Sequence, residues 1–164
     1  MEAKFEVKMT PKIMYDFMMY HTYRSMSGIL GVILGIAAFV MFGVTLGKTD
    51  LSYSIVYLLF GVWFILYLPV SLYTKSKRQV EKSEVFKKPV TYLLNDEGIR
   101  IIQDEENAQC AWENIRKVCR TGKSILIYSG KRNAFVLPKE AIGEQYDTLV
   151  TIVQKNMPKK KVKL

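Results

Sequence analysis

The sequence is poor in the side chains that build metal centres and disulfide frameworks. Among 164 residues it has one histidine, His21, and two cysteines, Cys110 and Cys119, which form neither a CxxC pair nor a Cys/His cluster. A structural zinc site needs several Cys or His ligands, and two cysteines are too few to staple a small fold. We therefore expect two reduced, half-buried thiols, no metal and no cofactor.

Motifs for catalysis are also missing. His21 lies far from the polar C-terminal part, so a Ser-His-Asp arrangement cannot be assembled, and residues 121–123 lack the spacing of a phosphate-binding P-loop. Acidic residues at 96–97 and 104–106 fall in predicted turns, where we expect solvated hairpin tips. We predict that the protein is not an enzyme.

Charge is absent from two long stretches, residues 25–47 and 51–74. Each is longer than the roughly 20 apolar residues that cross a hydrocarbon core about 30 Å thick. A protein of this size has too little surrounding chain to bury two wholly apolar helices on every side. We therefore predict a transmembrane hairpin over residues 25–74. Neither stretch has an Asp, Glu, Lys, Arg or His side chain, which argues against an ion or proton pathway.

The positive residues near these stretches indicate an orientation. Ten Lys and Arg residues flank the outer ends, whereas the connecting loop, residues 47–50, has only Lys48 beside Asp50. The positive-inside rule therefore places the loop outside and both termini in the cytoplasm, as in a multi-pass protein of the cell membrane. Residues 1–24 would then be a cytoplasmic strand and helix that lead straight into the membrane.

Small side chains recur every four residues in the first stretch, at Ser27, Gly31 and Gly35. Such a stripe lets a second helix approach closely. We expect these residues to pack against the second stretch of the same chain, with homo-oligomerisation as the alternative. Pro69 is expected to kink the second stretch near its cytoplasmic end.

The polar parts of the chain are predicted to form strands followed by a helix. Residues 3–9 alternate apolar and polar side chains, and Thr10 and Pro11 then form a helix start. An isolated strand is unstable, so this one must pair with the C-terminal part. Further strands are predicted at 90–94, 99–103, 108–112, 116–121, 124–129 and 134–138, before an amphipathic helix within 144–157.

Seven antiparallel strands closed by one helix match the plan of a pleckstrin-homology-like (PH-like) domain. The predicted fold class is an α+β membrane protein: a two-helix transmembrane hairpin plus a small antiparallel PH-like sheet or barrel with a C-terminal amphipathic helix. Residues 75–88 would be a basic juxtamembrane linker. Residues 89–157, completed by strand 3–9, would be the cytoplasmic domain, and residues 158–164 a flexible basic tail.

Several residues in the second half follow a family pattern. The pattern consists of a W-x-x-I-x-K-V segment, a strand ending in tyrosine and an aliphatic-Pro-Lys corner. In this sequence it is matched by Trp112, Ile115, Lys117, Val118, Tyr128, Pro138 and Lys139. In these features the chain resembles the YcxB-like family of bacterial membrane proteins. The resemblance implies a two-span anchor with a cytoplasmic PH-like domain. It also implies kinship with two-span proteins associated with self-protection against membrane-active peptides, envelope stress or secretion.

The formal net charge of +9 supplies the candidate binding residues. Cations beside a membrane are attracted to anionic lipid by about 1 kcal/mol each. No nucleic-acid recognition motif accompanies them, so we expect no nucleic acid partner. The alternative that they only set topology and solubility stays open. The candidates for lipid or partner binding are Lys75, Lys77, Arg78, Lys82, Arg116, Arg120, Lys123, Lys131 and Arg132.

These features favour a non-catalytic function. We expect a membrane-anchored module that binds a partner protein or the anionic inner leaflet, in a regulatory role or in self-protection against membrane-active peptides. The alternative is a small accessory subunit of a larger membrane complex, such as a transporter or secretion system. The tail at 158–164 is expected to face the inner leaflet or to be a solvated end.

Overall fold

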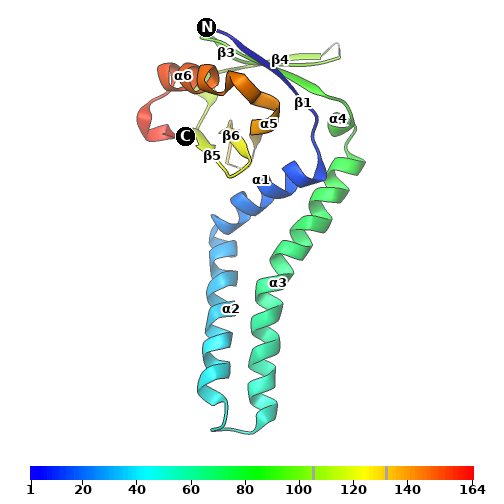
Figure 1. Cartoon of the computed structure of the whole chain (residues 1–164), viewed down its shortest axis with the longest axis vertical. Coiled ribbons are helices and arrows are strands. Elements are labelled where there is room, and N and C mark those ends of the chain that lie inside the picture. Colours follow the sequence, from blue (N-terminus) through cyan, green and yellow to red (C-terminus); the bar gives the residue numbers. More distant parts are fainter. Residues whose placement is uncertain (105, 132) are drawn as a thin grey trace. The chain divides into compact units, whose positions relative to one another are not determined.

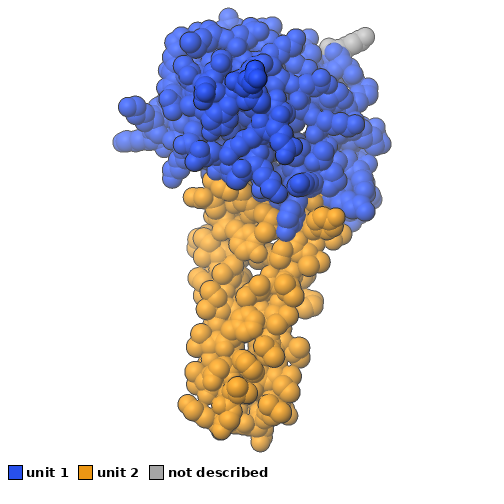
Figure 2. All heavy atoms as spheres, in the orientation of Figure 1, with its two compact units in different colours: residues 1–17, 77–164 blue, residues 18–76 orange. Residues whose placement is uncertain are grey.

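The computed structural model describes residues 1–104, 106–131 and 133–164 (Figure 1). The chain divides into two compact units (Figure 2). The first unit contains residues 1–17 and 77–164, and the second contains residues 18–76. The unit boundaries fall inside helices α1 (Pro11–Tyr23) and α3 (Leu51–Lys82). The first unit is therefore assembled from both ends of the sequence.

The N-terminal strand belongs to a four-stranded antiparallel sheet. Its order is β1 (Ala3–Val7), β2 (Val90–Leu94), β3 (Gly98–Gln103) and β4 (Glu106–Ala111). The alternation in β1 buries Ala3, Phe5 and Val7 and exposes the residues between them. Phe5 pairs with Tyr92, and their stacked rings lie 6.3 Å apart. The predicted pairing of this strand with the C-terminal part is confirmed, although the strand ends at Val7.

A second four-stranded sheet follows in the order β7, β6, β5 and β8. The strands β5 (Lys117–Arg120), β6 (Ser124–Tyr128) and β7 (Ala134–Pro138) pair antiparallel, and every residue of β6 is buried. The last strand, β8 (Val162–Lys163), pairs with β5 in parallel. Residues 162–163 were predicted to lie in a flexible tail, and that prediction is wrong.

Helix α6 (Tyr146–Asn156) joins both sheets to one hydrophobic core. Its Leu149, Ile152 and Val153 are wholly buried in the same cluster as Leu94 of the first sheet and Ile127 of the second. Burying side chains of this size contributes roughly 1.5–3 kcal/mol each. Short helical segments of this unit are α4 (Glu84–Lys87), η1 (Trp112–Asn114), α5 (Lys139–Ile142), η2 (Gly143–Gln145) and η3 (Lys159–Lys161).

The strands therefore form two sheets rather than one closed barrel. Within the described ranges no strand pairing joins the first sheet to the second. The pairing of β4 with β3 stops before Trp112. This residue begins the 3₁₀ turn η1 instead of ending a strand as predicted. The second sheet is also mixed, because β8 is parallel. The α+β class is confirmed in this coarser form.

The helical segments differ from the sequence prediction at two places. Residues 75–88 were predicted as a linker, but α3 continues to Lys82 because Lys, Arg, Gln and Glu favour helices. Helix α1 does not lead straight into α2 (Met26–Thr45). Ser25 is non-helical and lies between the two helices. It caps α2 by accepting a hydrogen bond from the Gly28 backbone N–H. The kink at Pro69 stays a prediction.

The second unit contains two long apolar helices. In the most apolar 18-residue segment of each helix, only 11% of the residues are buried. Both α2 and α3 are long and apolar enough to cross a membrane. They meet through small residues: a Cβ on Gly35 would lie 3.0 Å from Ile65 Cγ1, and one on Gly61 would lie 3.0 Å from the Phe39 ring. The hydroxyls of Thr45 and Ser54 lie 3.1 Å apart.

Gly98 tests how tightly the first sheet is packed. Its φ is +153°, and a Cβ there would lie 2.3 Å from the Cys110 carbonyl oxygen. We expect Gly98→Ala to lower the free energy of unfolding by more than about 2 kcal/mol, because backbone must shift. Gly122→Ala is the matched control, since its Cβ would meet nothing within 4 Å. Urea unfolding followed by circular dichroism measures both, and equal stabilities would contradict this packing.

Candidate functional site: a cationic surface at strand β5

Three cationic side chains line one hollow at the start of β5. Arg116 and Lys117 lie at the beginning of this strand, and Lys131 lies in the turn between β6 and β7. Together with Gly130 they surround a hollow of about 290 Å³. Among the ion pairs formed by the described residues, none involves these three cations. The hollow therefore concentrates positive charge that no acidic side chain among the described residues pairs with.

The backbone on both sides of this hollow is fixed by hydrogen bonds. The Arg116 N–H donates to the Tyr128 carbonyl at 2.8 Å, and the N–H groups of Ser129 and Gly130 donate to the Asn133 carbonyl at 3.2 and 3.3 Å. The Lys117 Nζ lies 4.4 Å from the centroid of the buried Tyr128 ring. A cation–π contact of this kind restrains the ammonium group. The charges are exposed, but their attachment points are rigid.

The C-terminal segment brings further cations to the same end of β5. Val162 pairs with Val118 and Lys163 with Cys119 in the parallel register. Lys161 therefore precedes the paired Val162 just as Lys117 precedes Val118, and paired strands lie about 4.8 Å apart. The exposed lysines of η3 (Lys159–Lys161) continue away from this point. This placement depends on the long-range register, so no local sequence signal predicts it.

The candidate binding cations in the strand region do not all lie together in the structure. Arg120 and Lys123 lie at the opposite end of the β5–β6 pair from Lys117, next to the turn that joins these strands. This turn is held by Thr121, whose hydroxyl donates to Asp16 at 2.8 Å and accepts from the Ser124 N–H at 2.9 Å. Arg132, another predicted member, lies outside the described residues. Arg116 and Lys131 are the candidates that share a hollow.

The remaining cationic candidates are on one helix. Lys75, Lys77, Arg78 and Lys82 are exposed near the C-terminal end of α3. The Lys77 Nζ lies 3.9 Å from a Glu81 carboxylate oxygen. In the described part of the chain, the other three form no ion pair. Their charge is therefore available to an external anion.

Of the predicted small-residue stripe, Gly31 and Gly35 lie close to α3. A Cβ on Gly31 would lie 3.3 Å from Leu68 Cδ1, and Gly35 is in contact with Ile65 as described above. Ser27 is exposed instead, and its hydroxyl lies 3.1 Å from that of Ser25. The stripe does not include Gly28, although a Cβ there would lie 2.0 Å from the Thr22 carbonyl oxygen.

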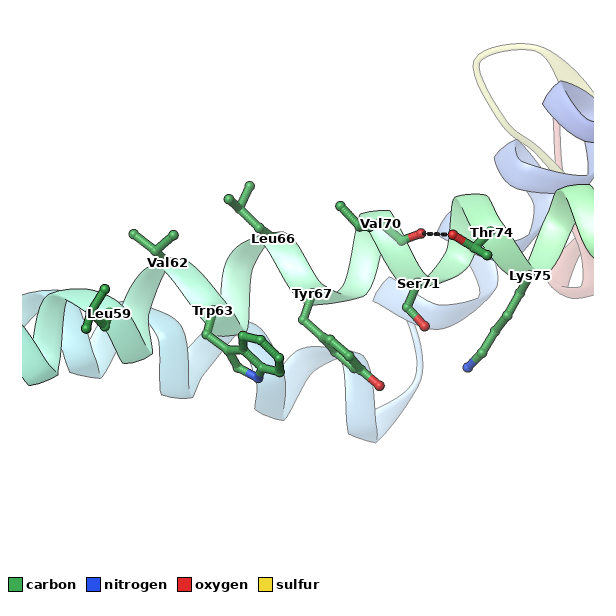
Figure 3. A pocket seen from close by; sticks show the side chains of 9 residues that line it. All are labelled: Leu59, Val62, Trp63, Leu66, Tyr67, Val70, Ser71, Thr74 and Lys75. Carbon is green, nitrogen blue, oxygen red and sulfur yellow. Dashed lines mark hydrogen bonds between the residues drawn. The ribbon is translucent and has the colours of Figure 1, made fainter.

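An apolar hollow follows one face of α3 (Figure 3). Its volume is about 760 Å³. The Trp63 and Tyr67 rings stack beside it, with centroids 5.4 Å apart and planes at 18°. Trp and Tyr side chains are enriched in membrane-spanning segments where these meet the membrane–water interface. The lining residues are Leu59, Val62, Trp63, Leu66, Tyr67, Val70, Ser71, Thr74 and Lys75.

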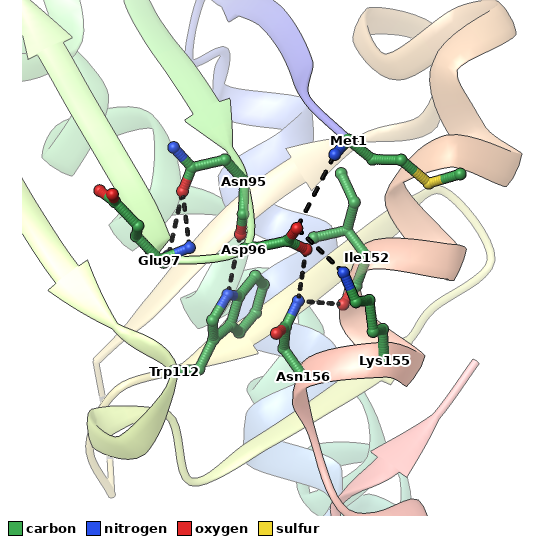
Figure 4. A network of polar contacts seen from close by, with 9 residues as sticks. Met1, Asn95, Asp96, Glu97, Trp112, Ile152, Lys155 and Asn156 are labelled. Atoms are coloured by element: carbon green, nitrogen blue, oxygen red, sulfur yellow. Dashed lines mark hydrogen bonds and ion pairs between the residues drawn. The ribbon is translucent and has the colours of Figure 1, made fainter.

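Asp96 is exposed in the turn between β2 and β3, as predicted, and it also takes part in a polar network (Figure 4). It accepts hydrogen bonds from Lys155 at 2.9 Å and Asn156 at 3.4 Å, and the Met1 amino group lies 3.8 Å away. The hydrogen bond from Lys155 is the main reason that the pKa of Asp96 is lowered. The turn between β2 and β3 is thereby tied to α6. Sequence reasoning missed this because Lys155 is 59 positions away.

The family-pattern residues are mainly structural. Trp112 is 8% exposed, and its Nε1–H donates to the Asn95 carbonyl at 2.9 Å. Ile115 and Val118 are buried in the core, and Pro138 is also buried. Lys139 donates its Nζ–H to the Gly122 carbonyl at 3.1 Å. Trp112 therefore supports the turn at Asn95.

A second polar hollow, of about 610 Å³, has mixed charge. Lys88 forms an ion pair with Asp104, and this hydrogen-bonded carboxylate raises the pKa of Lys88. Gln103 donates to the Val85 carbonyl at 2.7 Å. Because Glu84 and Glu106 also line this hollow, it is a poor site for an anion. The adjoining Glu105 lies outside the described residues.

The thiols are both free. Cys110 is half-buried, which raises its pKa through desolvation, and Cys119 is buried in β5. Over the ranges that the structure describes, no three His, Cys, Asp or Glu side chains converge on a position where they could hold a metal ion. The cationic hollow at β5 is therefore the strongest candidate for binding chemistry in the first unit.

Comparison with known proteins places the chain in a family. A family model described as YcxB-like protein matches residues 94–153. The chain is 30% identical to the uncharacterised protein YcxB of Bacillus subtilis (strain 168) over 112 residues, which are 67% of this chain and 60% of the length of that relative. The chain belongs to the YcxB-like family, as its sequence motifs predicted. No solved structure matches it significantly.

The Asp96 network predicts a pH-dependent contribution to stability. Because the folded-state pKa of Asp96 is lowered, its contribution is complete above the unfolded pKa of about 3.9 and is lost as the pH falls through the lower, folded value. We expect Asp96→Asn to lower the Tm at pH 7, with the gap closing below about pH 4. Glu97→Gln, in the same turn but without an ion pair to a described residue, is the control. A gap that stays constant with pH would contradict this role.

Proposed function

We propose that the protein is a non-catalytic, membrane-anchored module that binds anionic lipid at the cytoplasmic leaflet. In this proposal α2 and α3 cross the cell membrane, both termini lie in the cytoplasm, and the first unit is a PH-like domain. The proposal is supported by the two apolar helices, by the two sheets closed with α6 and by the positive charge at the end of α3.

The single observation that carries the proposal is the continuity of α3. This helix runs without a break from the apolar stretch into the basic segment that ends at Lys82. At 1.5 Å per residue, Lys75 to Arg78 lie within about 6 Å of Thr74 along the axis, and Lys82 lies about 12 Å away. With Thr74 at the edge of the bilayer, these distances are comparable to the Debye length of about 8 Å. A flexible linker would not hold the cations there.

The energetics favour binding to anionic lipid over a neutral surface. Each cation near a negatively charged leaflet contributes about 1 kcal/mol. Lys77 contributes less because of Glu81, whereas Arg78 and Lys82, four residues apart, share one face of the helix. This face therefore attracts acidic headgroups without needing a closed pocket.

The apolar face of α3 favours a second candidate function. The Trp63–Tyr67 stack and the hollow beside it offer a surface onto which another apolar helix can pack. The protein would then be an accessory subunit of a larger membrane complex. A partner retained by the full chain in mild detergent, but lost from W63A/Y67A, would support this role. Retention of the same partner by the double variant would count against it.

The lipid proposal predicts which cations select anionic lipid. The full chain is reconstituted with equal amounts of phosphatidylglycerol and phosphatidylcholine, extracted in mild detergent, and the retained lipids are quantified by mass spectrometry. We expect the wild type to enrich phosphatidylglycerol and R78Q/K82Q to reduce that enrichment at least about threefold.

The matched control for this experiment is K4Q/R100Q, which also removes one Lys and one Arg. Both residues are exposed on the first sheet, in one row across β1, β2 and β3. This control should keep the wild-type enrichment. Equal loss in both variants would indicate a general charge effect, and no enrichment in the wild type would refute the lipid proposal.

A further inference from the structure

We propose that the hollow between Arg116, Lys117 and Lys131, together with Lys161 of the docked C-terminal segment, binds a phosphate-bearing anion. The site is in the first unit and is built from β5, the β6–β7 turn and the residues before β8. It does not depend on the α3 cations of the proposed function. A negative binding result at one of these two sites therefore does not contradict binding at the other.

Apolar contacts, rather than charge, hold the C-terminal segment in place. Val162 and Leu164 pack against the core, and Met157, just before the segment, is buried. The β8 strand adds only a two-residue parallel pairing. The lysines at 159–161 are exposed and have no acidic partner among the described residues. Among the described residues, no ion pair of these lysines holds the C-terminal segment in place.

Docking brings like charges together. Extending the parallel register by one residue sets Lys161 opposite Lys117, and Lys117 shares the hollow with Arg116 and Lys131. Like charges at such separations repel, and the repulsion is stronger next to a low-dielectric core. Glu113, three residues before Arg116, is exposed and forms no ion pair with a described residue. An external anion at this position would relieve the repulsion.

The chemistry of the side chains favours phosphate over a single carboxylate. A guanidinium group presents a planar fork that bonds two phosphate oxygens, and lysine ammonium groups add charge without fixed geometry. Several cations are best matched by a group with more than one negative charge. The hollow of about 290 Å³ has room for a phosphate group with part of its hydration shell, because one water occupies about 30 Å³.

The source of the phosphate can be a soluble compound or a lipid headgroup, and one readout covers both. The full chain is placed in nanodiscs, and hydrogen exchange of the amides at 162–164 is measured. Three conditions are compared: phosphatidylcholine discs alone, the same discs with tripolyphosphate, and discs containing phosphatidic acid. At a ligand concentration of ten times the Kd, binding to the docked state slows exchange by about tenfold.

Slower exchange with tripolyphosphate indicates a soluble ligand, and slower exchange in phosphatidic acid discs indicates a headgroup. In both cases R116E/K131E should lose the response. This variant should also slow exchange at residues 162–164 without any anion, because it replaces two positive charges of the cationic hollow with negative ones and so removes the proposed repulsion of Lys161. R116Q/K131Q is the second variant in case charge reversal disturbs folding, which exchange of the β2 and β3 amides reports.

K4E/R100E is the matched control, because it reverses one Lys and one Arg on the other sheet. It should keep the full response, as should R78Q/K82Q, which separates this site from the α3 cations. The proposal is overturned if neither tripolyphosphate nor phosphatidic acid slows exchange, or if R116E/K131E and R116Q/K131Q respond like the wild type.

Discussion

The pairing of β1 with β2 is the constraint on which the rest of the structure depends. Residues 3–7 meet residues 90–94 in an antiparallel register, with Phe5 stacked on Tyr92, although both apolar helices lie between them in the sequence. The first sheet is therefore complete only when the segments before and after α2 and α3 come together. This pairing explains why Ala3, Phe5 and Val7 are buried with side chains from the far end of the chain.

Local periodicity was sufficient to predict much of the fold. The strands β2 and β7 have the predicted bounds, and Thr10 caps α1 through a hydrogen bond from the Ile13 N–H. Relations between distant residues were not predicted: the docking of Val162 beside β5 and the contact of Asp96 with Lys155. Each depends on register or packing between segments, which a single sequence does not encode as a local pattern.

The distribution of charge connects the fold to the proposed roles. Ion pairs compensate Lys77, Lys87, Lys88 and Lys155, all through acidic residues on nearby or facing segments. Lys75, Arg78 and Lys82 at the end of α3 and the cations around the start of β5 form no such ion pair with a described residue. Two surfaces thus have uncompensated positive charge, one on a helix that continues from an apolar stretch and one at the start of strand β5.

We propose a membrane hairpin whose loop lies outside while the assembled strands lie in the cytoplasm. The most direct measurement is labelling of single introduced cysteines in intact cells with a membrane-impermeant thiol reagent, and the unsubstituted chain gives the background from Cys110 and Cys119. Thr49→Cys, in the loop between α2 and α3, should be labelled in intact cells, and Lys163→Cys only after lysis. Labelling of Lys163→Cys in intact cells, or protection of Thr49→Cys, would contradict the account.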